Sequence, residues 1–111
     1  MVPVFPGGTP LGKTGGVPDL QCPAVAVLLD DDGPAPPWLE RLRVAERFTA
    51  REAGQVSALV EDGADLFRGE TFVVAAPAAE IAAALRRRGM AGAAPVVVEV
   101  DSSGWRRVPA P

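Results

Sequence analysis

The clearest pattern of apolar positions lies in the second half of the chain and predicts a strand, a helix and a second strand. Thr71 to Ala75 is a short apolar run with β-branched residues, which is typical of a buried strand. Ala78 to Arg88 consists mainly of strong helix formers, with Ile81 and Leu85 four residues apart on one face. Val96 to Val100 is apolar on both faces, as in a parallel strand that helices cover on each side.

The residues at the two ends of this helix agree with its predicted limits. Pro77 suits a first helical turn, where its missing N–H costs nothing, and Gly89 suits the position directly after the last turn. Arg86, Arg87 and Arg88 fall in that last turn, where cations interact favourably with the helix dipole. A solvated helix end explains the three arginines, and binding of an anionic partner is the alternative.

Further elements precede this unit. Ala24 to Leu29 is apolar throughout and predicts a first strand, and Trp38 to Glu46 predicts a short helix with one apolar face. Thr49 and Glu52 have the spacing of a capping box, in which each side chain bonds the backbone N–H of the other residue. This pattern predicts that another helix begins here.

The order of these elements predicts the fold class. With a brief strand over Arg47 to Thr49, strands and helices alternate from residue 24 to residue 101, which favours parallel pairing with helical crossovers. We therefore predict a single α/β domain over residues 24–101, with a small, mainly parallel sheet of about four strands flanked by helices. Residues 1–23 are rich in Pro and Gly and predict a flexible arm, and residues 102–111 predict a loop-like tail.

The segments VAVLLDDD, RFTAREAGQVSALVEDGADLF and FVVAAP follow one another in an order that resembles response-regulator receivers over residues 24–101. The resemblance implies a flavodoxin-like or receiver-like order of strands. Receivers carry a phospho-accepting Asp at the end of the third strand, whereas this chain has Ala75 and Ala76 there. The resemblance therefore implies a relative that is not phosphorylated at this position.

Composition narrows the possible functions. The chain of 111 residues is 48% hydrophobic and contains neither His nor Tyr, two of the commonest side chains in proton transfer. A net charge of −3 disfavours a nucleic-acid partner. No apolar run reaches the roughly 18 residues of a membrane helix, so no membrane partner is expected. Cys22 is the only cysteine, which excludes an internal disulfide and fits a reducing cytoplasm.

A phosphate-binding pattern occurs within the predicted arm. Residues 7–14, GGTPLGKT, match the P-loop motif, in which Lys13 would reach the outer phosphates and Thr14 would bind Mg²⁺. That chemistry requires a buried strand before the loop and a helix that begins at the Lys-Thr pair. Gly15, Gly16 and Pro18 follow instead, which favours a flexible arm over nucleotide binding.

Asp30, Asp31 and Asp32 follow the first predicted strand directly. Open α/β sheets bind ligands beyond the carboxyl ends of their strands, and carboxylate oxygens are the ligands that Mg²⁺ prefers. These three residues are therefore the candidate metal ligands. The alternative is a solvated turn, since Asp-Asp-Asp-Gly-Pro is ordinary turn chemistry.

Trp105, Arg106 and Arg107 are the candidate interface residues, because Trp and Arg are enriched among the anchors of protein interfaces. Packing of Trp105 onto its own sheet is the alternative. The sequence favours a non-catalytic, acidic protein that acts as a protein-interaction or regulatory module, through self-association or as an accessory subunit of a larger assembly. The competing hypothesis is a small Mg²⁺-dependent enzyme or a phosphate-binding or nucleotide-binding protein that uses the turn of Asp30 to Asp32.

Overall fold

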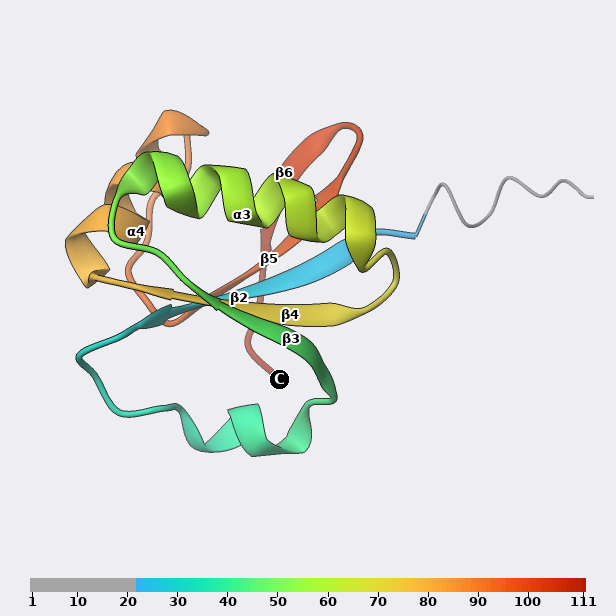
Figure 1. Ribbon diagram of the computed structural model, residues 1–111, viewed down its shortest axis with the longest axis horizontal. Helices are drawn as coiled ribbons and strands as arrows, with labels where there is room; N and C mark the ends of the chain where they lie inside the picture. Colours follow the sequence, from blue (N-terminus) through green and yellow to red (C-terminus); the bar gives the residue numbers. More distant parts are fainter. Residues whose placement is uncertain (1–21) are drawn as a thin grey trace, which may run out of the picture.

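The computed structural model describes residues 22–111 as one β-sheet with helices packed on it. In chain order the elements are β2 (Ala24–Asp30), the 3-10 helix η1 (Pro37–Arg41), β3 (Val44–Thr49), α3 (Ala53–Leu66), β4 (Thr71–Ala76), α4 (Ala78–Arg87), β5 (Val96–Asp101) and β6 (Gly104–Val108) (Figure 1). The predicted flexible arm lies outside the described residues up to Gln21, so its flexibility stays a prediction.

The sheet has five strands in the order β3-β4-β2-β5-β6. The strands β3, β4 and β2 run parallel to one another, whereas β5 is antiparallel to β2 and β6 is antiparallel to β5. In the central strand β2, Val27 lies opposite Val73 of β4 on one side and Val97 of β5 on the other. The sheet is therefore mixed, with two parallel and two antiparallel pairs of strands.

The prediction of a mainly parallel sheet of about four strands in flavodoxin-like or receiver-like order is wrong. After α4 the chain does not enter β5 from the end at which β2 begins. Residues 88–95 instead lead back to the carboxyl end of β2, where Val96 pairs with Leu28, so β5 runs in the opposite direction. The apolar pattern of Val96 to Val100 shows that both faces of this strand are covered. It does not show whether the strand runs parallel or antiparallel to β2.

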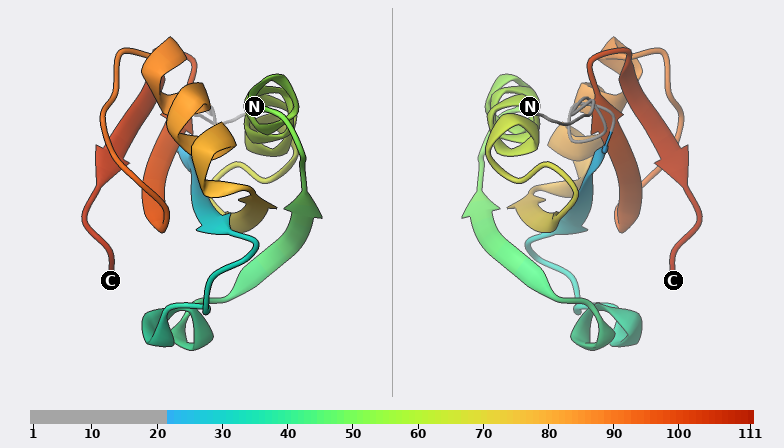
Figure 2. Two further views of the ribbon diagram at one scale, coloured as in Figure 1. Left: turned by 90° about the vertical axis from the view of Figure 1, so that its left-hand side faces the viewer. Right: turned by 90° about the vertical axis from the view of Figure 1, so that its right-hand side faces the viewer.

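The two faces of the sheet are covered unequally. Figure 2 shows α3 and α4 side by side on one face and η1 on the opposite face. Ala26 and Leu28 of β2 belong to the apolar core beneath the two α-helices, whereas Val27 and Leu29 belong to a smaller core with Leu39 of η1. Because side chains alternate along a strand, this central strand is apolar at each position from Ala24 to Leu29.

The segment after the first strand differs from its prediction. Trp38 to Glu46 was expected to form a helix, but helical structure ends at Arg41 and β3 begins at Val44. In η1 only Leu39 is buried, so this turn has a single strong anchor on the sheet. The brief strand predicted over Arg47 to Thr49 is present and extends three residues further toward the N-terminus.

The prediction of a loop-like tail over residues 102–111 is wrong for Gly104–Val108, which form strand β6. Ser102 and Ser103 make a two-residue turn between β5 and β6, and Gly104 has a φ of 128°, which favours glycine. The Ser103 N–H donates to Asp101 Oδ1 at 2.8 Å and holds the turn. A tight hairpin therefore extends the sheet beyond β5.

Helix α4 agrees with its prediction. It begins after Pro77, buries Ile81 and Leu85, and is followed by Gly89 with a φ of 72°. The N–H of Met90 returns to the carbonyl of Leu85, which closes the helix at its predicted end.

The capping box predicted for Thr49 and Glu52 is wrong, because α3 starts at Ala53 with no side-chain cap from its own N-terminal residue. Glu80 of α4 supplies the acceptor instead: the Ala53 N–H donates to Glu80 Oε1 at 3.1 Å. The Glu80 carboxylate lies in the first turn of its own helix and at the N-terminus of α3, and both positions favour a negative charge.

We expect Glu80→Ala to lower the free energy of unfolding by about 0.5 to 2 kcal/mol, the usual cost of a lost helix cap. Glu80→Gln should cost less, because it keeps an acceptor oxygen and loses only the charge. Urea unfolding of the wild type and both variants measures the difference. Equal losses of unfolding free energy in the two variants would contradict a capping role for the Oε1 oxygen of residue 80, which glutamine keeps and alanine lacks.

Gly63 lets α3 approach the sheet closely. A Cβ on Gly63 would lie 2.6 Å from the ring of Phe72 in β4, a distance that no normal contact allows. Phe72 packs with Phe48 and Phe67, whose ring centroids lie 6.1 and 5.9 Å from its own. The ring therefore has little room to move away from α3.

We expect Gly63→Ala to destabilise the fold by about 1 to 3 kcal/mol through overpacking, although alanine is the better helix former. Gly54→Ala in the same helix is the matched control, because its nearest neighbouring atom is Arg87 Nη1 at 3.8 Å. That control should be neutral or stabilising by up to about 1 kcal/mol. Urea unfolding tests both, and a stabilised Gly63→Ala would refute the close contact.

Candidate functional site

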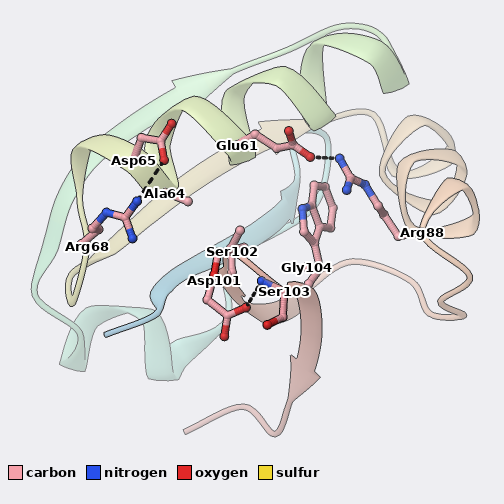
Figure 3. A pocket seen from close by; sticks show the side chains of 11 residues that line it. Glu61, Ala64, Asp65, Arg68, Arg88, Asp101, Ser102, Ser103 and Gly104 are labelled. Carbon is pink, nitrogen blue, oxygen red and sulfur yellow. Dashed lines mark hydrogen bonds and ion pairs between the residues drawn. The ribbon is translucent and has the colours of Figure 1, made fainter. Parts of the chain in front are cut away.

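A groove of about 430 Å³ lies between the C-terminal half of α3 and the β5–β6 hairpin. We call it the hairpin groove. Helices α3 and α4 lie side by side over the sheet (Figure 2), and the turn residues Ser102 and Ser103 between β5 and β6 are exposed. The lining of the groove includes the apolar residues Ala64, Val100 and Trp105. The turn residues Asp101 to Gly104 form one side (Figure 3).

Trp105 lies on the side of β6 that faces α3 and α4, and its ring packs against the apolar core beneath these helices. Its indole Nε1–H is buried and has no hydrogen-bond partner among the described residues. Most buried polar groups in proteins are paired, and leaving a donor unpaired costs about 1 to 3 kcal/mol. The indole N–H of the groove is therefore an unsatisfied donor.

Arg88 closes one end of the groove and joins three elements. Its guanidinium carbon lies 4.5 Å from the centroid of the Trp105 ring, a favourable cation–π distance. The same guanidinium forms an ion pair with Glu61 of α3, and Figure 3 shows these two side chains facing each other. Arg88 thus links the end of α4 to α3 and to β6.

The wall formed by α3 is acidic. Glu61 and Asp65 lie one turn apart on the groove side of the helix, and the last turn of α3 contains no basic residue. Asp65 pairs with Arg68 at 3.4 Å, and its side chain remains 77% exposed. Carboxylates near a helix C-terminus meet the negative end of its dipole, and the pairs with Arg68 and Arg88 offset their charge.

The predicted interface residues Trp105, Arg106 and Arg107 do not share one surface. Only Trp105 lines the hairpin groove. Arg106 donates to Glu99 at 2.9 Å and to Asp101 at 2.8 Å. Arg107 donates to the Ala91 carbonyl at 2.9 Å and so fixes the loop before β5.

The Arg106 pair also affects Asp101. The hydrogen bond from Arg106, assisted by the Ser103 N–H, lowers the pKa of the Asp101 carboxyl below its ordinary value. A lowered pKa in the folded state stabilises the fold above the ordinary pKa of aspartate, and this contribution is lost as pH falls through the lowered value. Asp101 is therefore occupied by a structural partner and holds the hairpin.

The predicted metal ligands Asp30, Asp31 and Asp32 come together at the carboxyl end of β2. One carboxylate oxygen from each lies within 4.8 Å of the others, with Asp31 and Asp32 exposed. Asp30 Oδ1 accepts the Asp32 N–H at 3.0 Å, and the Gly33 N–H donates to the Asp30 carbonyl at 3.2 Å. These bonds are those of a turn in which the first aspartate caps its own loop.

Binding of Mg²⁺ at this turn is tested by thermal unfolding of the wild type and Asp31→Asn, each with and without the metal. If the three aspartates form a turn and no metal site, we expect Mg²⁺ to leave the melting temperature unchanged, because a ligand raises the melting temperature only by binding the folded state. Asp31→Asn should then be neutral or slightly stabilising, since it relieves repulsion between adjacent carboxylates. A rise in the wild type that is absent in the variant would establish a metal site.

The remaining predicted site residues, Lys13 and Thr14 of the P-loop pattern, lie outside the described residues. The sequence does not identify Glu61, Asp65 or Arg68, and it predicts that Arg88 belongs to a solvated helix end, with binding of an anionic partner as the alternative. The side chains that line the groove come from α3, the end of α4 and the β5–β6 hairpin, and no sequence motif links them. Trp105 is the one residue of the groove that the sequence alone marks as a candidate contact residue.

Comparisons with protein-family models, with curated proteins and with solved structures found no match. Neither α-helix in residues 22–111 combines the length and the apolar character needed to cross a membrane. Any assignment of function therefore has to be argued from the geometry of the groove and the acidic turn.

Proposed function

We propose that this protein is a non-catalytic protein-contact module, a regulatory or accessory component, and that its hairpin groove binds a peptide segment. The observation that carries the proposal is the buried, unpaired indole N–H of Trp105 beside the groove. A carbonyl oxygen of a bound peptide would satisfy that donor once the side chains that cover it move aside. Trp and Arg are also the side chains most enriched at interface anchor positions, and the groove contains Trp105 with Arg88 stacked on it.

The chemistry of the lining favours a peptide over a small apolar ligand. Pockets for small molecules are lined mainly by hydrophobic and aromatic side chains with few polar groups. The hairpin groove instead presents carboxylates from α3, the guanidinium groups of Arg68 and Arg88, and the two serines of the hairpin turn. A peptide backbone offers both donors and acceptors to such a lining.

Pairing of the charged groups supports a binding role over a catalytic one. Glu61 is held by Arg88, Asp65 by Arg68 and Asp101 by Arg106, so each carboxylate at the groove already has a cationic partner. A general acid or base requires a group that is free to exchange protons near neutral pH. The sequence contains no His to supply such a group.

The second candidate function is a small Mg²⁺-dependent enzyme or a phosphate-binding protein centred on the acidic turn. The proximity of the carboxylates of Asp30, Asp31 and Asp32 favours it. The neighbouring strand β4 ends with Ala75 and Ala76, and Pro77 comes directly after it. None of these three residues has a side chain that can act in acid–base chemistry. Thermal unfolding of the wild type and Asp31→Asn with and without Mg²⁺ distinguishes a metal site at these aspartates from an ordinary turn.

The contact function is tested by selecting binders from a library of random short peptides displayed against the full chain. Selected peptides should shift the indole N–H signal of Trp105 and the amide signals of the hairpin turn in NMR spectra. Trp105→Phe keeps an aromatic ring and removes the N–H, and should weaken binding about threefold to tenfold, the value of one hydrogen bond.

Trp38→Phe is the matched control, because Trp38 packs in the smaller core on the opposite face of the sheet. It should leave peptide affinity unchanged. Failure to select any binder, or binders whose shifts map to the turn of Asp30 to Asp32, would overturn the proposed function. Sedimentation of the free protein shows whether the segment bound is instead part of a second copy of this chain.

A further inference from the structure

We propose that the exposed proline segment between β2 and η1, Pro34 to Pro37, is itself a ligand. Its partner is another protein that binds a polyproline II helix in a groove lined by aromatic side chains. The segment leads into η1, which lies on the face of the sheet opposite to α3 and α4 (Figure 2). The inference therefore concerns a second contact surface and does not depend on what the hairpin groove binds.

The first support is the backbone conformation that the sequence imposes on this segment. Proline fixes its own φ at about −65°, and the residue before a proline is restricted to extended or polyproline II conformation. Pro34, Pro36 and Pro37 are prolines, and Ala35 and Pro36 each precede one. Pro36 has a φ of −67° and a ψ of 143°, close to the polyproline II values of about −75° and 145°.

The second support is the pattern of exposure along the segment. A polyproline II helix has about three residues per turn, so Pro34 and Pro37 lie on one edge and Pro36 lies on another. Pro34 and Pro37 are exposed, whereas Pro36 is half-buried. Aromatic-lined grooves recognise prolines at this Pro-x-x-Pro spacing. The edge that a partner would read is therefore the edge that faces solvent.

The third support is that the fold holds both ends of the segment. Before it, the Gly33 N–H donates to the Asp30 carbonyl at 3.2 Å. After it, the Leu39 N–H donates to the Pro36 carbonyl at 3.0 Å, and the Leu39 side chain is buried in η1. A segment that is already ordered loses little conformational entropy on binding, which favours affinity.

The backbone between these two ends is open to a partner. Among residues 22–111, no backbone N–H donates to the carbonyl of Pro34 or Ala35. Figure 1 shows the segment in the loop between β2 and η1, on the side of the molecule away from α3. A partner can therefore reach both the proline rings and the two carbonyl oxygens.

Two other places in the chain contain neighbouring prolines. Pro109 and Pro111 are exposed, but they are two residues apart and would lie on different edges of a polyproline II helix. Pro3 and Pro6 have the spacing of Pro34 and Pro37 but lie outside the described residues. Variants at these prolines are therefore the comparisons that the test requires.

The test selects binders from a library of WW domains, which keep their groove aromatic side chains and carry randomised loops, against the full chain. A free polyproline peptide should displace the selected domains. Pro34→Ala/Pro37→Ala should weaken their binding about tenfold to a hundredfold, because both prolines on the exposed edge lose their apolar contact. Pro34→Ala alone, which leaves η1 untouched, should weaken it about threefold to tenfold.

Pro109→Ala/Pro111→Ala is the matched control, because it makes the same change at two exposed prolines with a different spacing. It should leave the affinity of the selected domains unchanged. Trp105→Phe should also leave it unchanged, since Trp105 lines the hairpin groove. The test of the proline segment is thereby separate from the test of the groove.

Three results would overturn the proposal. The first is the absence of any binder that polyproline displaces. The second is binding that Pro3→Ala/Pro6→Ala abolishes and that Pro34→Ala/Pro37→Ala leaves intact. The third is self-association of the free protein that Pro34→Ala/Pro37→Ala abolishes, because the partner would then be a second copy of this chain.

Discussion

The central strand β2 has apolar side chains on both faces, and the rest of the structure depends on covering both. Two α-helices cover one face and a single 3-10 turn with Leu39 covers the other. Helix α3 packs close to the sheet because Gly63, which has no side chain, lets the helix approach the ring of Phe72. The turn of the β5–β6 hairpin stays exposed, and the hairpin groove lies between it and the C-terminal half of α3.

The parts of the fold that could be predicted from the sequence are those with local causes. Helix α4 has a proline before it, a glycine after it, and Ile81 and Leu85 on one face, and all of these lie within the helix or next to its ends. The direction of β5 has no such local cause, since it depends on where residues 88–95 lead the chain. The cap of α3 likewise comes from Glu80, which lies 27 residues from Ala53 in the sequence.

The same distinction applies to the candidate sites. The three aspartates after β2 are consecutive, so their proximity follows from the sequence, although the hydrogen bond from the Asp32 N–H to Asp30 is that of a turn. The groove joins Glu61, Arg88 and Trp105, which meet only because α3, α4 and the hairpin pack together. Its residue type made Trp105 a candidate contact residue, but the proximity of Glu61 and Arg88 could be seen only in the tertiary structure.

Arg88 connects the stability of the fold with the binding proposed for the groove. Its guanidinium stacks on Trp105 and pairs with Glu61, so it holds the end of α4 against both walls. The indole N–H of Trp105 is buried beside this stack, so the side chains that cover it would have to move before a peptide carbonyl could accept from it.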